Sequence, residues 1–156
     1  MESTFYNWYV NKIDAKGRVS VPAAFRGQID TKTFNGIAAF PSFKFPMVEG
    51  SGIERTDWMR RQLETLPEFS DEYDAMQELF SETVPIPFDG EGRIVLPQPL
   101  LAHANLTDSV LFAGAGNVFQ MWEPNAYETY KTTMRDRRRA AGSIFAPRRS
   151  APGETA

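Results

Sequence analysis

The sequence contains no cysteine and a single histidine among its 156 residues. Without thiols it can form no disulfide framework, no cysteine nucleophile and no zinc ribbon, which fits a reducing compartment. It also lacks any run of about 18 apolar residues, the length that a membrane-spanning helix needs. Residues 1–10 have neither the basic start nor the apolar stretch of a secretion signal. These absences predict a cytoplasmic protein with no membrane partner.

Residue patterns for catalysis are scarce as well. His103 has no serine or carboxylate motif around it, and residues 114–116, Gly-Ala-Gly, lack the third glycine and the following helix of a phosphate-binding loop. Asp14 and Asp89 occupy matching places in the two halves of the chain and could form a carboxylate pair, but neither has the small hydroxyl residue that such dyads use. The sequence therefore predicts no enzymatic activity, no catalytic residue, no cofactor and no metal site.

Apolar side chains are plentiful, and the charge is unevenly distributed. Hydrophobic residues make up 42% of the chain, with 12 Phe, 5 Tyr and 3 Trp, which indicates a folded globular core. The formal net charge is −3, but residues 1–130 carry a net −8 and residues 131–149 a net +6. A basic segment of this kind either follows the phosphates of a nucleic acid or is a solvated helix end with a disordered terminus. The sequence leaves both interpretations open.

A nine-residue pattern occurs twice, 75 residues apart: "DAKGRVSVP" over residues 14–22 and "DGEGRIVLP" over residues 89–97. In each copy an Asp and a Gly three positions later are typical of a tight turn, because Asp bonds the backbone ahead of it and Gly tolerates positive φ. The predicted turn-forming residues are Asp14, Gly17, Asp89 and Gly92. Units of about 45 residues bury too little surface alone, so this repeat predicts two similar halves that share one core.

Similar elements surround both copies of the motif. The pattern predicts an extended run before each motif, a short helix opened by proline after it, and then a hairpin. The extended runs are 8–13 and 84–88, the short helices 22–26 and 97–101, and the hairpin strands 37–40 with 43–45 and 110–113 with 118–122. Alternating prolines in 84–88 favour the edge of a sheet.

Residues 56–80, between the halves, are typical of two helices. Thr56 is predicted to cap the first helix, which Pro67 ends, and Ser70 to cap the second. A last helix is predicted over 124–139. The expected organisation is a first unit (7–54), a helical connector (55–81), a second unit (82–125), a C-terminal helix (126–140) and a disordered tail (141–156).

An arginine follows the glycine in both turns. Each turn would hold its arginine, Arg18 or Arg93, at a strand entrance, and arginine is suited to bidentate contact with guanine or phosphate. A structural alternative remains open, in which Asp14 and Asp89 bind these arginines and only lock the turns.

The surroundings of the two arginines differ in charge. Basic residues lie near Arg18 in the sequence, whereas Asp89 and Glu91 lie near Arg93, so the first copy is the better candidate for reading DNA. The predicted DNA-binding residues are Lys12, Lys16, Arg18, Arg26 and Arg93.

The doubled motif, with "IDAKGRVSVPAAFR" and "LTDSVLFAGAGNVFQMW" around it, resembles the MraZ family of bacterial transcriptional regulators over about residues 5–130. The resemblance implies an α+β fold, mainly β: a pseudo-symmetric double-split β-barrel of two AbrB-like (SpoVT-AbrB) swapped-hairpin units with a helical connector and a C-terminal helix. It implies a closed ring of identical subunits. It also implies that the first motif, with Lys16 and Arg18, contacts DNA upstream of the division and cell-wall gene cluster, usually repressing it, with Arg93 as a weaker contact.

The function expected from this resemblance is that of a nucleoid-associated repressor, which binds tandem direct repeats of double-stranded DNA as a ring homo-oligomer. The alternative is an interaction module of the same fold, antitoxin-type or a structural ring, whose C-terminal segment binds a partner protein. Two stretches depart from the family pattern: the N-terminal "MESTFYNWYVNKI" and the tail from Arg135 onward.

Overall fold

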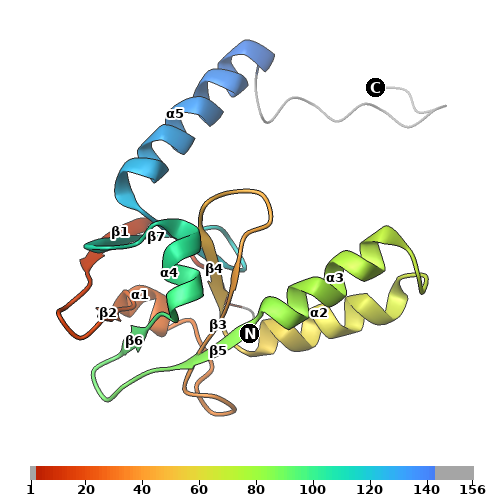
Figure 1. The fold of residues 1–156 in the computed structure, drawn as a ribbon, viewed down its shortest axis with the longest axis horizontal. Coiled ribbons are helices and arrows are strands. Elements are labelled where there is room, and N and C mark those ends of the chain that lie inside the picture. Colours follow the sequence, from red (N-terminus) through yellow and green to blue (C-terminus); the bar gives the residue numbers. More distant parts are fainter. Residues whose placement is uncertain (1–2, 143–156) are drawn as a thin grey trace. The chain divides into compact units, whose positions relative to one another are not determined.

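The computed structural model describes residues 3–142, and it has an α+β fold (Figure 1). These residues form eight strands and five helices: β1 Trp8–Lys12, β2 Arg18–Ser20, α1 Ala23–Arg26, β3 Gly36–Pro41, β4 Val48–Ser51, α2 Glu54–Thr65, α3 Asp71–Glu82, β5 Val84–Pro87, β6 Arg93–Val95, α4 Gln98–Ala104, β7 Ser109–Gly114, β8 Phe119–Trp122 and α5 Pro124–Ala141. The chain divides after Pro124 into a main body and a second unit that contains most of α5. From residue 143 on, the predicted disordered tail lies outside the described residues.

The two halves of the repeat exchange strands. Six strands form an antiparallel sheet in the order β1-β7-β8-β4-β3-β5. β1, which precedes the first motif, pairs with β7 of the second half, and β5, which precedes the second motif, pairs with β3 of the first half. The predicted α+β fold, mainly β, is confirmed, and its main element is this large antiparallel sheet. Among the described strands no pairing joins β1 to β5, so the sheet is open and no closed barrel is formed by these ladders.

One apolar core contains residues from both halves. Phe25 of α1 and Phe119 of β8 lie 5.2 Å apart between ring centroids, and both pack against Phe5, at 5.5 and 5.2 Å. Aromatic pairs of this kind add about 0.5–1.5 kcal/mol each beyond their buried area. The two halves therefore share one core, as the repeat predicted.

The unusual N-terminal stretch is part of this core. Phe5 is 2% exposed, and its N–H and C=O bond the backbone of Gly116, at 2.6 and 3.0 Å. Gly114 permits the close approach, because a Cβ there would stand 2.3 Å from the Tyr6 nitrogen. The segment before β1 therefore fastens the start of the first half to the hairpin of the second.

The first hairpin differs from the prediction. Residues 43–45 were expected to be a strand, but they form a turn in which the Ser42 hydroxyl accepts the N–H groups of Lys44 and Phe45, at 3.2 and 3.1 Å. The returning strand is β4, whose sequence Val-Glu-Gly-Ser has little strand character. Its Gly50 makes room for packing, since a Cβ there would meet the Phe119 ring at 2.6 Å. Contact with the other half decided where this strand lies.

The predicted helix caps are confirmed only in part. Ser70 caps α3 as predicted, because its hydroxyl accepts the Tyr73 N–H at 3.1 Å. The prediction for Thr56 was wrong: α2 begins at Glu54, and Thr56 lies inside it with its hydroxyl bonded to the Ile53 carbonyl. The edge position predicted from the prolines of β5 is confirmed. No helix within residues 3–142 is both long and apolar enough to cross a membrane.

Candidate nucleic-acid interface

β2 and β6 form a two-stranded antiparallel ribbon that carries both motif arginines. The facing residues are Arg18 with Val95, Val19 with Ile94, and Ser20 with Arg93. Val19 and Ile94 are each 1% exposed and belong to the core. Because side chains alternate along a strand, Arg18 and Arg93 lie on the outer face. The two loops that lead into the ribbon lie at one end of the body, away from α2 and α3 (Figure 1).

The first turn is built around Asp14. Its backbone closes the turn, with the Gly17 N–H donating to the Asp14 carbonyl at 3.0 Å and the Asp14 N–H donating to the Arg18 carbonyl at 2.8 Å. One carboxylate oxygen accepts the backbone N–H groups of Lys16 and Arg18, both at 2.9 Å. The other accepts the Arg18 Nε–H at 2.7 Å. Gly17 has φ of 82°, a conformation that favours glycine.

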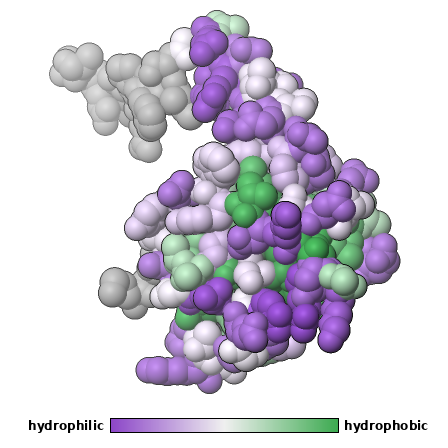
Figure 2. All heavy atoms as spheres, turned by 90° about the vertical axis from the view of Figure 1, so that its left-hand side faces the viewer, coloured by the Kyte–Doolittle hydropathy of each residue, from purple (hydrophilic) through white to green (hydrophobic). Residues whose placement is uncertain are grey.

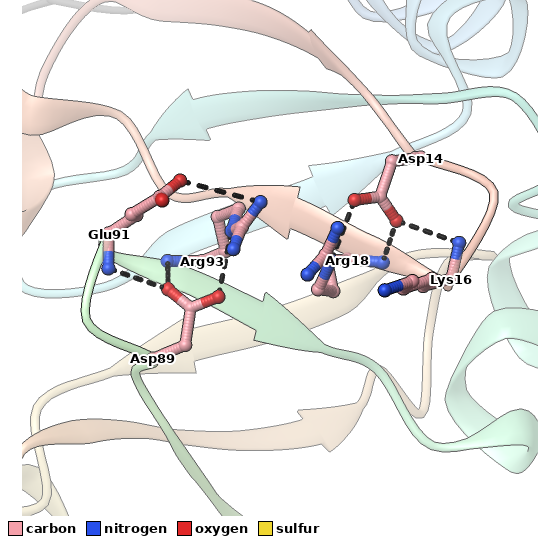
Figure 3. A network of polar contacts seen from close by, with 6 residues as sticks. All are labelled: Asp14, Lys16, Arg18, Asp89, Glu91 and Arg93. Atoms are coloured by element: carbon pink, nitrogen blue, oxygen red, sulfur yellow. Dashed lines mark hydrogen bonds and ion pairs between the residues drawn. The ribbon is translucent and has the colours of Figure 1, made fainter.

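The second turn repeats this arrangement around Asp89. Its carboxylate accepts the backbone N–H groups of Glu91 and Arg93 at 2.8 and 2.9 Å, and the Arg93 Nε–H at 2.7 Å. Gly92 has φ of 76°. Figure 3 shows the two networks side by side on the ribbon, with the arginine side chains between the two aspartates. The motif therefore specifies the same turn in both halves.

These hydrogen bonds favour the ionised form of both aspartates. The backbone N–H of Arg93 is the main cause that lowers the pKa of Asp89 to about 2, with further contributions from the Glu91 N–H and the Arg93 side chain. The pKa of Asp14 is also lowered, mainly by the Arg18 N–H. The bond to Asp89 raises the pKa of Arg93. Each aspartate therefore stays negative and holds its arginine, as in the structural alternative that the sequence left open.

Holding the arginine does not use its whole guanidinium. Asp14 binds only Nε of Arg18, and within residues 3–142 no acceptor bonds its two terminal Nη groups. Arg93 differs, because its Nη1 also faces the Glu91 carboxylate at 3.4 Å. Terminal Nη groups make a two-pronged donor that fits guanine or phosphate. The lock at Asp14 thus leaves Arg18 oriented and able to donate, while Arg93 is neutralised further.

The other predicted cations lie in different places. Lys16 is exposed in the first turn and Lys12 is exposed at the end of β1. Arg26 is another of the predicted DNA-binding residues; it contacts the Val21 carbonyl and lies against Gly92, where a Cβ would stand 2.5 Å from the Arg26 Nε. The structure thus brings Arg26 of the first half against the second turn.

One supporting residue gave no signal in the sequence. The side-chain amide of Asn11, in β1, donates to the Ser20 carbonyl at 2.7 Å. This bond fastens the end of β2 to the six-stranded sheet. The sequence alone does not distinguish this asparagine from any other in a strand. Only the placement of β1 against β2 gives it this role.

His103 lies in the last turn of α4, where its Nε2 is 3.2 Å from the Phe45 carbonyl. Within residues 3–142, no group of three or more His, Asp or Glu side chains is placed to hold a metal ion.

Comparisons with known proteins identify the family of this chain. The sequence model of a family described as "MraZ protein, putative antitoxin-like" matches residues 79–143. A protein of Rickettsia rickettsii called "Transcriptional regulator MraZ" is 42% identical over 129 residues, which cover 82% of this chain and 87% of that protein. Proteins of the same name from Rickettsia felis and Rickettsia bellii are 41% and 43% identical, over 82% and 77% of this chain and 87% and 81% of their own lengths. With this identity over more than three quarters of its length, the chain belongs to the MraZ family.

Proposed function

We propose that the protein is a sequence-specific DNA-binding transcriptional regulator that reads DNA with its first turn. The observation that carries the proposal is the state of Arg18: its Nε is fixed by Asp14, and its two Nη groups have no acceptor within residues 3–142. The names of its relatives, "Transcriptional regulator MraZ", support the same function. The protein acts on the nucleoid in the cytoplasm and is not an enzyme.

The proposed contact follows from the chemistry of the turn. Arg18 donates through both Nη groups to a guanine edge or to a phosphate, and a good bidentate contact with a base contributes about 1–3 kcal/mol of discrimination. Lys16 places a point charge beside it for the neighbouring phosphate. Lys12 adds charge at the end of β1. Arg93, on the second turn, and Arg26, from α1 beside that turn, are weaker contacts.

Affinity requires several subunits. The five residues of the first turn carry a net charge of +1, and each neutralised phosphate contributes only modestly at physiological salt. We infer a closed ring of identical subunits that binds tandem direct repeats about 10 base pairs apart. With this spacing, the Arg18 turns of neighbouring subunits enter the DNA from the same side. The targets are promoter repeats upstream of the division and cell-wall gene cluster, including the protein's own gene, which it represses.

The proposed unit of this ring is two AbrB-like swapped hairpins in a double-split barrel. The first unit spans 7–54 and the second 82–125, with the connector 55–81 between them and the C-terminal helix over 126–140. The strand exchange between β1 and β7 and between β5 and β3 supports this organisation.

Binding to synthetic promoters tests the proposal. Duplexes with one, two and three repeats should bind with steeply rising affinity, and a five-base-pair insertion between repeats should abolish the gain, because it turns the next groove to the far side. Equal affinity for one and three repeats, or indifference to the insertion, would refute the tandem-repeat mechanism. Failure to prefer any of these duplexes over a shuffled one would refute sequence-specific binding.

A second candidate is an interaction module of the same fold, antitoxin-type or a structural ring. The description of the matched family as antitoxin-like is the observation that favours it. This function requires a protein partner and no specific DNA. A mobility shift with the promoter duplex separates the two, because a module that serves only protein binding gives no shift.

A further inference from the structure

The second half of α5 carries the densest positive charge of the described chain. Residues 135–139 read Arg-Asp-Arg-Arg-Arg, and all four arginines are exposed. An ion pair on this helix lies earlier, between Lys131 and Glu128 at 3.4 Å. Within residues 3–142, no carboxylate pairs with any of the four guanidiniums. Figure 2 shows that much of the surface of this helix is hydrophilic.

Helix stability does not explain four arginines here. Two of them, Arg138 and Arg139, lie in the last turn, where a cation offsets the helix dipole of about half a charge. Arg135 faces both of them at spacings of three and four residues, and like charges at these spacings destabilise a helix. The cluster therefore exceeds what the helix end uses, and a polyanion would relieve its repulsion.

The composition of the segment selects the kind of polyanion. Between Arg135 and Gly142 there is no apolar side chain larger than alanine. A protein interface needs buried anchors such as aromatic residues, and a membrane-surface helix needs an apolar face. Arginines without such anchors, distributed over several sides of a helix, fit the uniform charge of a nucleic-acid backbone.

We propose that Arg135, Arg137, Arg138 and Arg139 form a sequence-independent contact with the DNA phosphate backbone. The proposal rests on the proposed DNA-binding function and adds a second contact that strengthens binding without selecting a sequence. Four guanidiniums occur within a helical rise of about 6 Å. Phosphates along one strand are spaced about 3.4 Å along the DNA axis, so each helix reaches about two of them.

The test compares two variants of the full-length chain. The arm variant changes Arg135, Arg137, Arg138 and Arg139 to Gln, which keeps helix propensity. The control variant changes four exposed cations of the main body, Lys32, Lys44, Arg60 and Arg61, to Gln, and so removes the same charge elsewhere. Dissociation constants are measured against sodium chloride concentration on a promoter-repeat duplex and on a shuffled duplex of equal length and composition. Circular dichroism and sedimentation verify folding and assembly.

We expect the arm variant to lower the slope of log K against log salt by about 2 per engaged helix. Between about 50 and 200 mM salt, the wild type should lose about tenfold more affinity per engaged helix than this variant. The difference should be the same on both duplexes, so the preference for the promoter stays unchanged. The control variant should keep most of the wild-type slope.

Four outcomes would overturn the proposal: a wild-type slope in the arm variant, an equal change in the control variant, a lost preference for the promoter, or altered assembly without a change in slope. The last outcome would show that these arginines contact another copy of the chain instead of DNA. A wild type that binds both duplexes equally refutes sequence-specific reading instead, and the slope on the shuffled duplex still decides the role of the arginines.

Discussion

The turn at residues 14–18 and the turn at residues 89–93 share one hydrogen-bond pattern and carry opposite charges. In both, the Nε of the arginine lies 2.7 Å from the carboxylate of the aspartate four residues earlier. The first turn has a net charge of +1 and the second −1, because Lys16 corresponds to Glu91. Glu91 also takes up an Nη group of Arg93, whereas Lys16, a cation, takes up neither Nη group of Arg18.

This comparison distinguishes the residues that fix the shape of the turn from those that set its charge. Asp and Gly determine the turn, since the carboxylate and the positive φ recur in both copies. The residues between them are free to vary without loss of that geometry, and they set the charge that DNA would meet. One copy can therefore support the shared core while the other is available for the proposed DNA contact.

The largest effect is expected from removing the two arginines separately. Arg18→Ala should weaken binding to the promoter duplex by about 1–3 kcal/mol per contact. Arg93→Ala should cost less, because Glu91 already binds this side chain. Titrations at one salt concentration measure the affinity of both alanine variants. Arg18→Lys keeps the charge but loses the two-pronged donor, so it should resemble Arg18→Ala in specificity. Equal losses from the two alanine variants would show that the copies read DNA alike.

Replacing the glycines of the two turns should lower the unfolding free energy by different amounts. Gly17→Ala should cost about 1–2 kcal/mol of unfolding free energy, since its φ is positive and the nearest atom to a Cβ, Val95 Cγ1, is 3.9 Å away. Gly92→Ala should cost slightly more, because the added Cβ also displaces the flexible end of the Arg26 side chain, whose Nε would be 2.5 Å away. Urea unfolding measures both values. A larger loss at Gly17 would contradict the placement of Arg26 on the second turn.

Giving one turn the charged residue of the other, at position 16 or at position 91, should make the two turns more alike in DNA binding. Lys16→Glu should lower the slope of log K against log salt by about 0.9, and Glu91→Lys should raise it by a similar amount through one added phosphate contact. Over a fourfold rise in salt, from about 50 to 200 mM, this change of slope alters the loss of affinity by only about threefold in each case. The same titrations on a shuffled duplex serve as the control. No change with Glu91→Lys would place the second turn away from DNA.

The smallest effect is expected from acid. Asp89 has a folded pKa of about 2 against an ordinary value of 3.8, so between these pH values the folded chain binds fewer protons than the unfolded chain. The stabilisation is complete above about pH 4 and is lost as the pH falls toward 2. Asp89→Asn should flatten this part of the stability curve, and Asp14→Asn should do so in the same direction. Urea midpoints from pH 5 to pH 2 measure it, and a curve unchanged in both variants would show that these bonds do not matter for folding.

Local chemistry let the sequence predict much of this protein. The two turns, the cap at Ser70 and the edge position of β5 depend on hydrogen bonds within about four residues or on the missing N–H of proline, and such features are written in neighbouring residues. The doubled motif also predicted a core shared by the two halves. The interpretation of Arg18 as either reader or lock could not be decided at that level, because both depend on the same Asp14.

Only the tertiary structure decided which distant segments meet. It placed β4 at Val48–Ser51 rather than at 43–45, because Gly50 accommodates the Phe119 ring from the other half. It brought Arg26 to Gly92 and Asn11 to Ser20, contacts that no local pattern encodes. The exchange of strands between the halves follows from packing and register across the whole core, which a window of neighbouring residues does not contain.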